Sequence, residues 1–421
     1  MFKKIPGTKD ILPEEASWWQ KIEKISRNIF SLYSYSEIRP PLIEEEALFN
    51  RSLGESTEIV QKQMFLIKKE NDLYALRPEG TASLVRAYLE NNLDKTAGFI
   101  KLYYIGPMFR LERPQKGRLR QFHHIGCEAI GSTDVNLDIE VISLADRLLK
   151  AYSIEDYTIQ LNSLGCARDK KELIKILHKA LEHKLVQLCA DCRIRFKNNI
   201  LRILDCKNEG CRNLIKKIDL QNHHLCEDCK TQFSKVKDGL DALKIDYEIN
   251  PYLVRGLDYY TRTVFEITHK ELGAQDSLGA GGRYDSLVHQ LGGPDVGAIG
   301  FAFGVERLFL VSSIEHGFTD KNLVYLITLG EEAKLQGLRL LHQLRQAGIN
   351  SDTDYEGKTL KGAMRKANDL GAKYVIIIGE DELKKNVVTL KDLASGEQKE
   401  VGFENLTTEL ITNYKIKILP C

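Results

Sequence analysis

The chain has 421 residues, and its 60 Lys and Arg nearly balance its 59 Asp and Glu, so no global excess of positive charge indicates a nucleic-acid partner. A chain of this length exceeds one ordinary hydrophobic core and predicts two or three domains. The N-terminus lacks a signal-peptide pattern and no run of about 18 apolar residues predicts a membrane helix, so we expect a cytoplasmic protein with no membrane partner.

The first block, residues 1–167, combines one amphipathic helix with several strands. EEASWWQKIEKISRNIFSLY carries apolar residues at helical spacing, and DLYALRPEG, FIKLYYIGPMFRLE and RQFHHIGCEAIG read as strands. Loops rather than regular helices separate these strands. The block therefore predicts a largely antiparallel sheet and an α+β fold.

The second block, residues 168–245, reads as lysine-rich helices inserted into the first fold. It holds 18 Lys and Arg against 11 Asp and Glu, whereas the whole chain has a surplus of one. A solvated helical face is the ordinary meaning of such a pattern, and a surface for phosphates is the alternative.

Six of the nine cysteines fall between residues 189 and 229. Without secretory signals they indicate reduced thiols or metal ligands rather than disulfides. Two CxxC pairs, Cys189 with Cys192 and Cys226 with Cys229, suit one tetrahedral zinc site. The open alternatives are Cys206 and Cys211 replacing either pair, His223 and His224 as spare ligands, or no metal at all.

The third block, residues 246–318, returns to strands and glycine-rich turns in RGLDYYTRTVFEI, SLGAGGRYDSLV and AIGFAFGVERLFLV. The fourth block, residues 319–421, alternates strands such as LVYLITLG and KYVIIIGEDE with helices such as LKGAMRKANDLG. This alternation predicts a small, separate α/β domain.

Charged residues in apolar surroundings mark the candidate site. Arg110, Arg255 and Arg307 each suggest an ion pair when taken alone, but together they suggest convergence on one polyanion. Glu79 and Glu128 could anchor an ammonium or an imidazole N–H, or pair with an arginine. The sequence contains neither a P-loop nor a Rossmann fingerprint, which disfavours the two commonest nucleotide folds.

These segments carry a resemblance to a known family. GPMFRLERPQKGRLRQFHHIGCE and AIGFAFGVERLFL resemble the second and third signature motifs of class II aminoacyl-tRNA synthetases, and EIRPPLIEEEALF resembles the first. RGLDYYTRTVFEI and GAGGRYDSLV resemble the two signatures of histidine–tRNA ligases. The resemblance implies an antiparallel-sheet catalytic core with a mainly helical insertion, followed by an anticodon-binding domain, in a homodimer.

The resemblance also implies a reaction and its residues. L-histidine would react with ATP and Mg²⁺ to form an adenylate and would then pass to the terminal ribose of tRNA(His). Arg110 and Arg255 would grip the α-phosphate, and Arg307 the distal phosphates. Histidine would contact the set Glu79, Thr81, His124, Glu128, Tyr259, Tyr260 and Tyr284, and the acceptor end of tRNA would contact Gln115 and Arg118. The insertion would clamp the acceptor stem, and any zinc there would be structural and remote from the adenylate.

Two positions depart from the family pattern, and one alternative function stays open. His124 stands where glutamine is usual, so its contact with the substrate ammonium requires a neutral imidazole. Ser34 replaces a common glycine in a turn. The alternative is a non-catalytic, histidine-binding regulatory paralogue of histidine biosynthesis, which would be expected to lose the catalytic arginines and the C-terminal domain.

Overall fold

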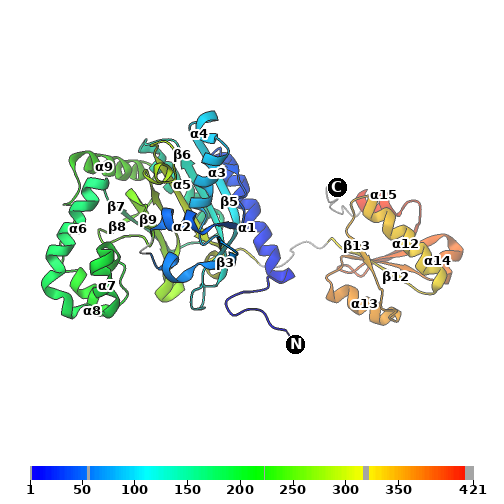
Figure 1. The fold of residues 1–421 in the computed structure, drawn as a ribbon. Helices are drawn as coiled ribbons and strands as arrows, with labels where there is room; N and C mark the ends of the chain where they lie inside the picture. The colour runs from blue at the N-terminus through cyan, green and yellow to red at the C-terminus, as the bar shows by residue number, and fades with distance from the viewer. Residues whose placement is uncertain (1, 55–56, 222, 316–321, 413–421) are drawn as a thin grey trace. The chain divides into compact units, whose positions relative to one another are not determined.

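The computed structural model describes residues 2–54, 57–221, 223–315 and 322–412, and the chain divides into two compact units, Met1–Glu315 and His316–Cys421 (Figure 1). The boundary predicted between residues 318 and 319 lies outside the described residues.

An eight-stranded sheet organises the first unit. Its strand order is β1-β5-β6-β11-β10-β9-β7-β8, and every pair is antiparallel except β1 with β5 and β7 with β8 at the two edges. The strands are β1 (Ser36–Glu37), β5 (Ile100–Phe109), β6 (Gln121–Ile130), β11 (Ala298–Gly304), β10 (Ser277–Arg283), β9 (Thr261–His269), β7 (Tyr157–Ser163) and β8 (Glu248–Ile249). The predicted α+β fold with a largely antiparallel sheet is confirmed.

Because side chains alternate along each strand, the two faces of this sheet differ in polarity. On β6, Ile125 and Cys127 point into a core that also contains Trp18 of α1 (Pro13–Leu32) and Val141 of α5 (Asn136–Ala151). The intervening even-numbered residues of β6 face the opposite side. One face is thus an apolar core covered by α1 and α5, and the other is available for polar chemistry.

Shorter elements border the polar face. A three-stranded antiparallel sheet joins β2 (Ile43–Glu45), β4 (Asp72–Leu76) and β3 (Phe65–Lys69). Nearby elements are α2 (Glu46–Leu53), η1 (Ile59–Gln63), α3 (Thr81–Glu90), α4 (Leu93–Thr96), η4 (Lys270–Gln275), α10 (Leu287–Gln290) and α11 (Val305–Val311). Ser34, in the turn after α1, has a φ of 62°, a left-handed conformation that favours glycine. This explains why glycine suits that turn.

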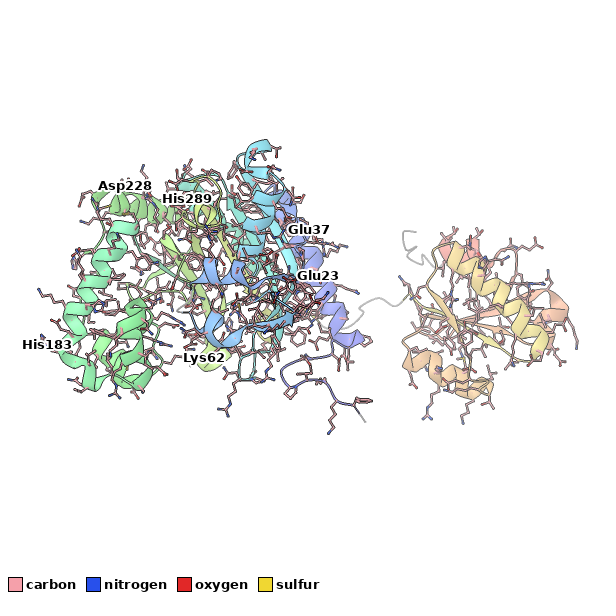
Figure 2. The ribbon with its side chains drawn as sticks, viewed as in Figure 1. Glu23, Glu37, Lys62, His183, Asp228 and His289 are labelled. Atoms are coloured by element: carbon pink, nitrogen blue, oxygen red, sulfur yellow. The ribbon has the colours of Figure 1, made fainter. Side chains whose placement is uncertain are left out.

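A helical insertion joins β7 to β8. It contains α6 (Ala167–Leu181), η2 (Glu182–Gln187), α7 (Ala190–Asn198), η3 (Ile200–Ile203), α8 (Glu209–Ile215) and α9 (Glu227–Ala242). Figure 2 labels His183, just after α6, and Asp228, near the start of α9, on the outside of this insertion. Leucines of α6, including Leu173 and Leu177, belong to one buried cluster with Val264 of β9 and with Tyr259 of the loop that precedes β9. The insertion therefore packs onto the core of the first unit.

The second unit has helices on both faces of a five-stranded sheet. The strand order is β13-β12-β14-β15-β16, parallel around β12 and antiparallel from β14 onward. Its elements are β12 (Val324–Thr328), α12 (Glu331–Gln346), β13 (Ser351–Thr353), α13 (Leu360–Asp369), β14 (Tyr374–Ile378), α14 (Glu380–Lys385), β15 (Val387–Asp392), β16 (Gln398–Gly402) and α15 (Leu406–Thr412). Val324 packs with Leu340 of α12, and Tyr325 packs with Ala363 of α13. Among the described helices of either unit, none combines the length and apolar character needed to cross a bilayer.

Candidate active site

A cavity on the polar face of the eight-stranded sheet brings together segments that are far apart in the sequence. It is lined from β5, β6, β10, β11, the start of α3 and the loop that precedes β9. Its lining includes Glu79, Thr81, Arg110, Arg118, His124, Glu128, Arg255, Tyr259, Tyr260, Tyr284 and Arg307. Of the residues predicted to contact a substrate, Gln115 is not part of the lining.

Backbone carbonyl oxygens orient Arg110 and Arg307 in this cavity. Arg110 Nε donates to the carbonyl of Pro78 at 2.9 Å, and Arg307 Nε donates to the carbonyl of Gly117 at 3.0 Å. Burial lowers the pKa of both arginines. These carbonyl oxygens orient the two guanidinium groups, and Arg110 Nη1 also lies 3.9 Å from Glu112 Oε1. A guanidinium held in the cavity lining favours an anion.

Arg255 has a close carboxylate partner, the partly buried Glu266. Its Nη1 lies 2.5 Å from Glu266 Oε1, on the strand β9 that follows the Arg255 loop. Burial opposes the charge of Arg255, but the attraction of Glu266 holds its pKa above the ordinary value. Glu266 therefore fixes the guanidinium in its charged form at the cavity wall.

Glu128 forms the acidic end of the cavity. Its Oε1 accepts the hydroxyl hydrogen of Thr81 at 2.7 Å, and its Oε2 accepts that of Tyr284 at 2.6 Å. Burial raises the pKa of Glu128 to about 8, against the stabilising effect of these hydrogen bonds. Gly300 on the neighbouring strand β11 permits this arrangement, because a Cβ there would lie 1.7 Å from Glu128 Oε2.

Glu79 is held by the start of α3. Its Oε2 accepts the backbone N–H of Thr81 at 2.7 Å, and its Oε1 accepts that of Ala82 at 2.8 Å. Burial raises the pKa of Glu79, although these backbone donors favour its ionised form. The carboxylate is therefore a fixed acceptor, and the oxygen lone pairs that these bonds leave unused can face an ammonium group.

Three tyrosines shape the space beside Glu128. The rings of Tyr259 and Tyr260 lie 4.8 Å apart, and those of Tyr259 and Tyr284 lie 5.6 Å apart. All three side chains are buried and line the cavity. This aromatic wall with hydroxyl groups suits a flat polar ring.

His124 lies on the same face of β6 as Glu128. Burial lowers the pKa of His124 well below its ordinary value, and the nearby Arg110, Arg77 and Arg307 act in the same direction. Its Nδ1 is buried and accepts no hydrogen bond from the residues that the structure describes. The imidazole is thus neutral at pH 7 and can accept a hydrogen bond.

Gln115 and Arg118 face each other in the loop between β5 and β6. The N–H of Gln115 donates to the carbonyl of Arg118 at 3.1 Å, and Gln115 is exposed. Arg118 pairs with Glu112, which lies between it and Arg110. The loop thus places Arg118 in the lining of the cavity and leaves Gln115 exposed nearby.

A sequence model of the histidyl-tRNA synthetase family matches residues 7–308, and one of the anticodon binding domain matches residues 323–413. A histidine–tRNA ligase of Halothermothrix orenii is 46% identical over 408 residues, which are 96% of this chain and 97% of that protein. The chain belongs to the histidyl-tRNA synthetase family. A second relative, the histidine–tRNA ligase of Thermotoga petrophila, is 45% identical over 95% of this chain and 96% of its own.

A solved structure agrees with this membership of the histidyl-tRNA synthetase family. The crystal structure of apo S. aureus histidyl-tRNA synthetase has a TM-score of 0.81 and 35% identity, covering 97% of this chain and 99% of that one. The histidyl-tRNA synthetase of Nostoc sp. PCC 7120 has a TM-score of 0.68 at 21% identity, which supports the fold alone.

Two site residues of this histidyl-tRNA synthetase family member were missed by sequence reasoning. Glu266 fixes Arg255, and Glu112 lies between Arg110 and Arg118. Glu266 had a detectable signal, since it is an acid in an otherwise apolar stretch of the TVFEI strand. Glu112 lies in a charged loop and had none.

The structure divides the cysteines differently from the predicted zinc site. Cys189 and Cys192 lie with Cys206 and Cys211, whereas Cys226 and Cys229 lie with Cys166 and Asp169. The predicted set of two CxxC pairs is therefore not brought together, because the pairs begin two different helices, α7 and α9. The alternative in which Cys206 and Cys211 replace one pair matches the geometry. His223 and His224 belong to neither group among the described residues.

Proposed function

We propose that the cavity joins L-histidine to ATP and that the chain then transfers the histidyl group to tRNA(His). The observation that carries this proposal is that Arg110, Arg255 and Arg307 line the same cavity as the Glu128–Tyr284 pair. One end of the cavity suits a polyphosphate, and the other suits a polar aromatic ring.

In the first step, a carboxylate oxygen of histidine attacks the α-phosphorus of ATP, and the bond to the pyrophosphate oxygen breaks. Negative charge accumulates on the oxygens of the α-phosphate, so preorganised cations lower the barrier. Arg110 and Arg255 hold these oxygens from two sides, and Arg307 holds the distal phosphates. ATP enters as its Mg²⁺ complex, in which phosphate oxygens supply much of the coordination.

Histidine recognition uses the acidic end of the cavity. Glu128 and Tyr260 read the two ring nitrogens, while Tyr259 and Tyr284 enclose the ring. A site that hydrogen-bonds a polar substrate rejects analogues that lack the matching group. Glu79 and Thr81 receive the α-amino group, together with the neutral imidazole of His124.

In the second step, a hydroxyl of the terminal ribose of tRNA attacks the histidyl carbonyl, and AMP leaves with its bonding electrons. Gln115 and Arg118 at the mouth of the cavity contact the acceptor end. The basic insertion clamps the acceptor stem, and the second unit reads the anticodon. Phosphate contacts by the insertion would make tRNA affinity salt-dependent.

The oligomeric state and the cellular compartment of the protein are inferred from its exposed apolar side chains and its free thiols. We propose a homodimer, because large apolar side chains are exposed on and beside the three-stranded sheet and a second subunit would cover them. These side chains are Leu42, Ile43, Leu66 and Leu73. We further propose that the protein acts in the cytoplasm, where free cysteines persist.

Amino-acid-dependent exchange of pyrophosphate into ATP tests the proposed function. We expect exchange with histidine and none with threonine, proline or glycine. No exchange with any amino acid, together with binding of histidine, would favour the regulatory paralogue. Relatives named histidine–tRNA ligase at about 45% identity over nearly the whole chain favour the enzyme.

A further inference from the structure

Two groups of four side chains with metal-binding atoms lie within the insertion and at its base. The first is the all-cysteine group, defined as Cys189, Cys192, Cys206 and Cys211, and the second is the mixed group, defined as Cys166, Asp169, Cys226 and Cys229. Within each group, the four ligand atoms all lie within 4.8 Å of one another. The proposed aminoacylation chemistry uses none of these residues.

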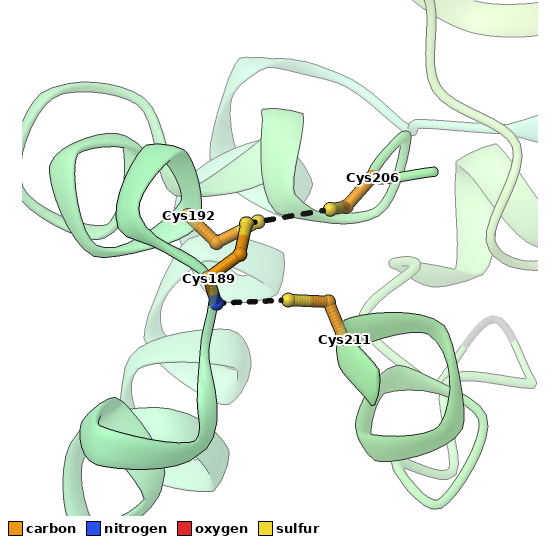
Figure 3. A group of neighbouring side chains, drawn as sticks. All are labelled: Cys189, Cys192, Cys206 and Cys211. Carbon is orange, nitrogen blue, oxygen red and sulfur yellow. Dashed lines mark hydrogen bonds between the residues drawn. The ribbon is translucent and has the colours of Figure 1, made fainter. Parts of the chain in front are cut away.

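The spacing of the sulfur atoms in the all-cysteine group fits a single ion better than a disulfide. Thiolates at about 2.3 Å from a tetrahedral zinc ion lie about 3.8 Å from each other. The Sγ atoms of Cys189 and Cys206 are 3.8 Å apart, whereas a disulfide requires about 2.05 Å. Figure 3 shows the four side chains converging from three segments of the insertion. The four sulfur atoms therefore lie close enough together to bind one metal ion.

Three of the ligand pairs share one local geometry. In each pair the first residue is the N-cap of a helix and the second is its third residue, as in Cys189 and Cys192 of α7 and in Cys226 and Cys229 of α9. Cys166 and Asp169 occupy the same two positions of α6. The first turn of a helix therefore sets the spacing of both ligand atoms.

The mixed group closes the base of the insertion. Cys166 and Asp169 begin α6, where the chain enters the insertion, and Cys226 and Cys229 begin α9, by which it leaves. Arg262 on β9 places its Nη1 4.0 Å from Cys229 Sγ, so a cation offsets the negative charge that three thiolates and a carboxylate would bring.

We propose that each group binds one zinc ion, with four thiolate ligands in the all-cysteine group and three thiolates plus the Asp169 carboxylate in the mixed group. Thiolate ligands select zinc over magnesium or calcium, and a full set of four protein ligands makes a structural rather than a catalytic site. A multi-iron cluster would need its thiolates farther apart than those of the all-cysteine group.

Both ions would also brace the loop that carries Arg255. Lys170, next to Asp169, donates from Nζ to the carbonyl of Asp258 at 2.7 Å. Asn199, between the two halves of the all-cysteine group, donates from Nδ2 to Asp258 Oδ1 at 2.8 Å. The loop is thus held by one segment from each metal site. The effect of this bracing on histidine activation rests on the proposed function, whereas the proposed metal binding does not.

Elemental analysis of the purified full chain tests the proposal without any activity measurement. We expect two zinc ions per chain and no iron. X-ray absorption at the zinc edge averages over both ions and should give sulfur and oxygen ligands in a ratio of seven to one. The two groups together offer seven thiolates and one carboxylate. One zinc or less per chain, or iron in place of zinc, would overturn the proposal.

Paired substitutions assign each ion to its group. Cys192→Ser with Cys206→Ser should lose one zinc and leave a shell with three sulfurs and one oxygen. Cys226→Ser with Cys229→Ser should lose the other and leave an all-sulfur shell. The matched control is Cys127→Ala, a buried thiol of the sheet outside both groups, which should keep both ions. If the first pair of substitutions removed no zinc, the assignment of an ion to the all-cysteine group would be wrong. Wild-type absorption data decide the question if a variant fails to fold.

Discussion

The buried carboxyl of Glu128 predicts an unusual pH dependence of stability. Burial raises the pKa of Glu128 to about 8 in the folded chain, from an ordinary value of 4.5. The folded state therefore binds more protons than the unfolded state between these values, so this group's contribution to stability falls as pH rises. The slope is about 1.4 kcal/mol per pH unit and levels off near pH 8, which gives a loss of about 2 kcal/mol between pH 6 and pH 8.

Glu128→Gln removes this titration while leaving an amide that can bond to the hydroxyls of Thr81 and Tyr284. The melting temperature of wild type should fall between pH 6 and pH 8 by about 4 °C more than that of Glu128→Gln. Tryptophan fluorescence suits the assay, because the chain's two tryptophans, Trp18 and Trp19, both lie in the first unit. Glu172→Gln, at an exposed position of α6, should behave as wild type. Equal shifts for wild type and Glu128→Gln would refute the assigned pKa.

Three further predictions follow from contacts around the cavity. Gly300→Ala should abolish histidine-dependent exchange, because the new Cβ would lie 1.7 Å from Glu128 Oε2, and isothermal titration with histidine would show whether binding survives. Arg283→Met should lower the melting temperature by several degrees, since it leaves Asp138 buried without its 2.6 Å partner at a cost of about 3–5 kcal/mol; unchanged melting would contradict this. His124→Gln should leave the pH profile of histidine KM unchanged between pH 6 and pH 8, because burial and nearby arginines already hold the pKa of His124 well below its ordinary value. A new inflection in wild type near pH 6.5 that the variant lacks would show a charged His124.

The periodicity of the sequence predicted the architecture well. The antiparallel sheet follows from strand-like runs joined by loops, and the second unit follows from its regular alternation of strands and helices. The alternation of β6 places His124 and Glu128 on one face, away from the core residue Ile125. Arginines in apolar stretches also marked the cavity, because burial of a charge without a partner is costly.

The spacing of residues along the sequence did not predict which residues far apart in the chain would contact each other. The two CxxC pairs have the same spacing in the sequence, but Cys189 and Cys226 begin different helices. The packing of those helices determines which other metal-binding side chains lie next to each pair. Glu266 is paired with Arg255 only because the loop before β9 turns back onto the strand. Each of these contacts depends on tertiary geometry.

Histidine-dependent exchange of pyrophosphate into ATP by Arg255→Ala tests the central claim most directly. If Arg255 stabilises charge on the α-phosphate beside the histidine pocket, kcat should fall by about 10²- to 10³-fold. Lys270→Ala, which removes an exposed positive charge from the same unit, should match wild type. An Arg255→Ala variant that keeps its fold and exchanges within about threefold of wild type would contradict the account.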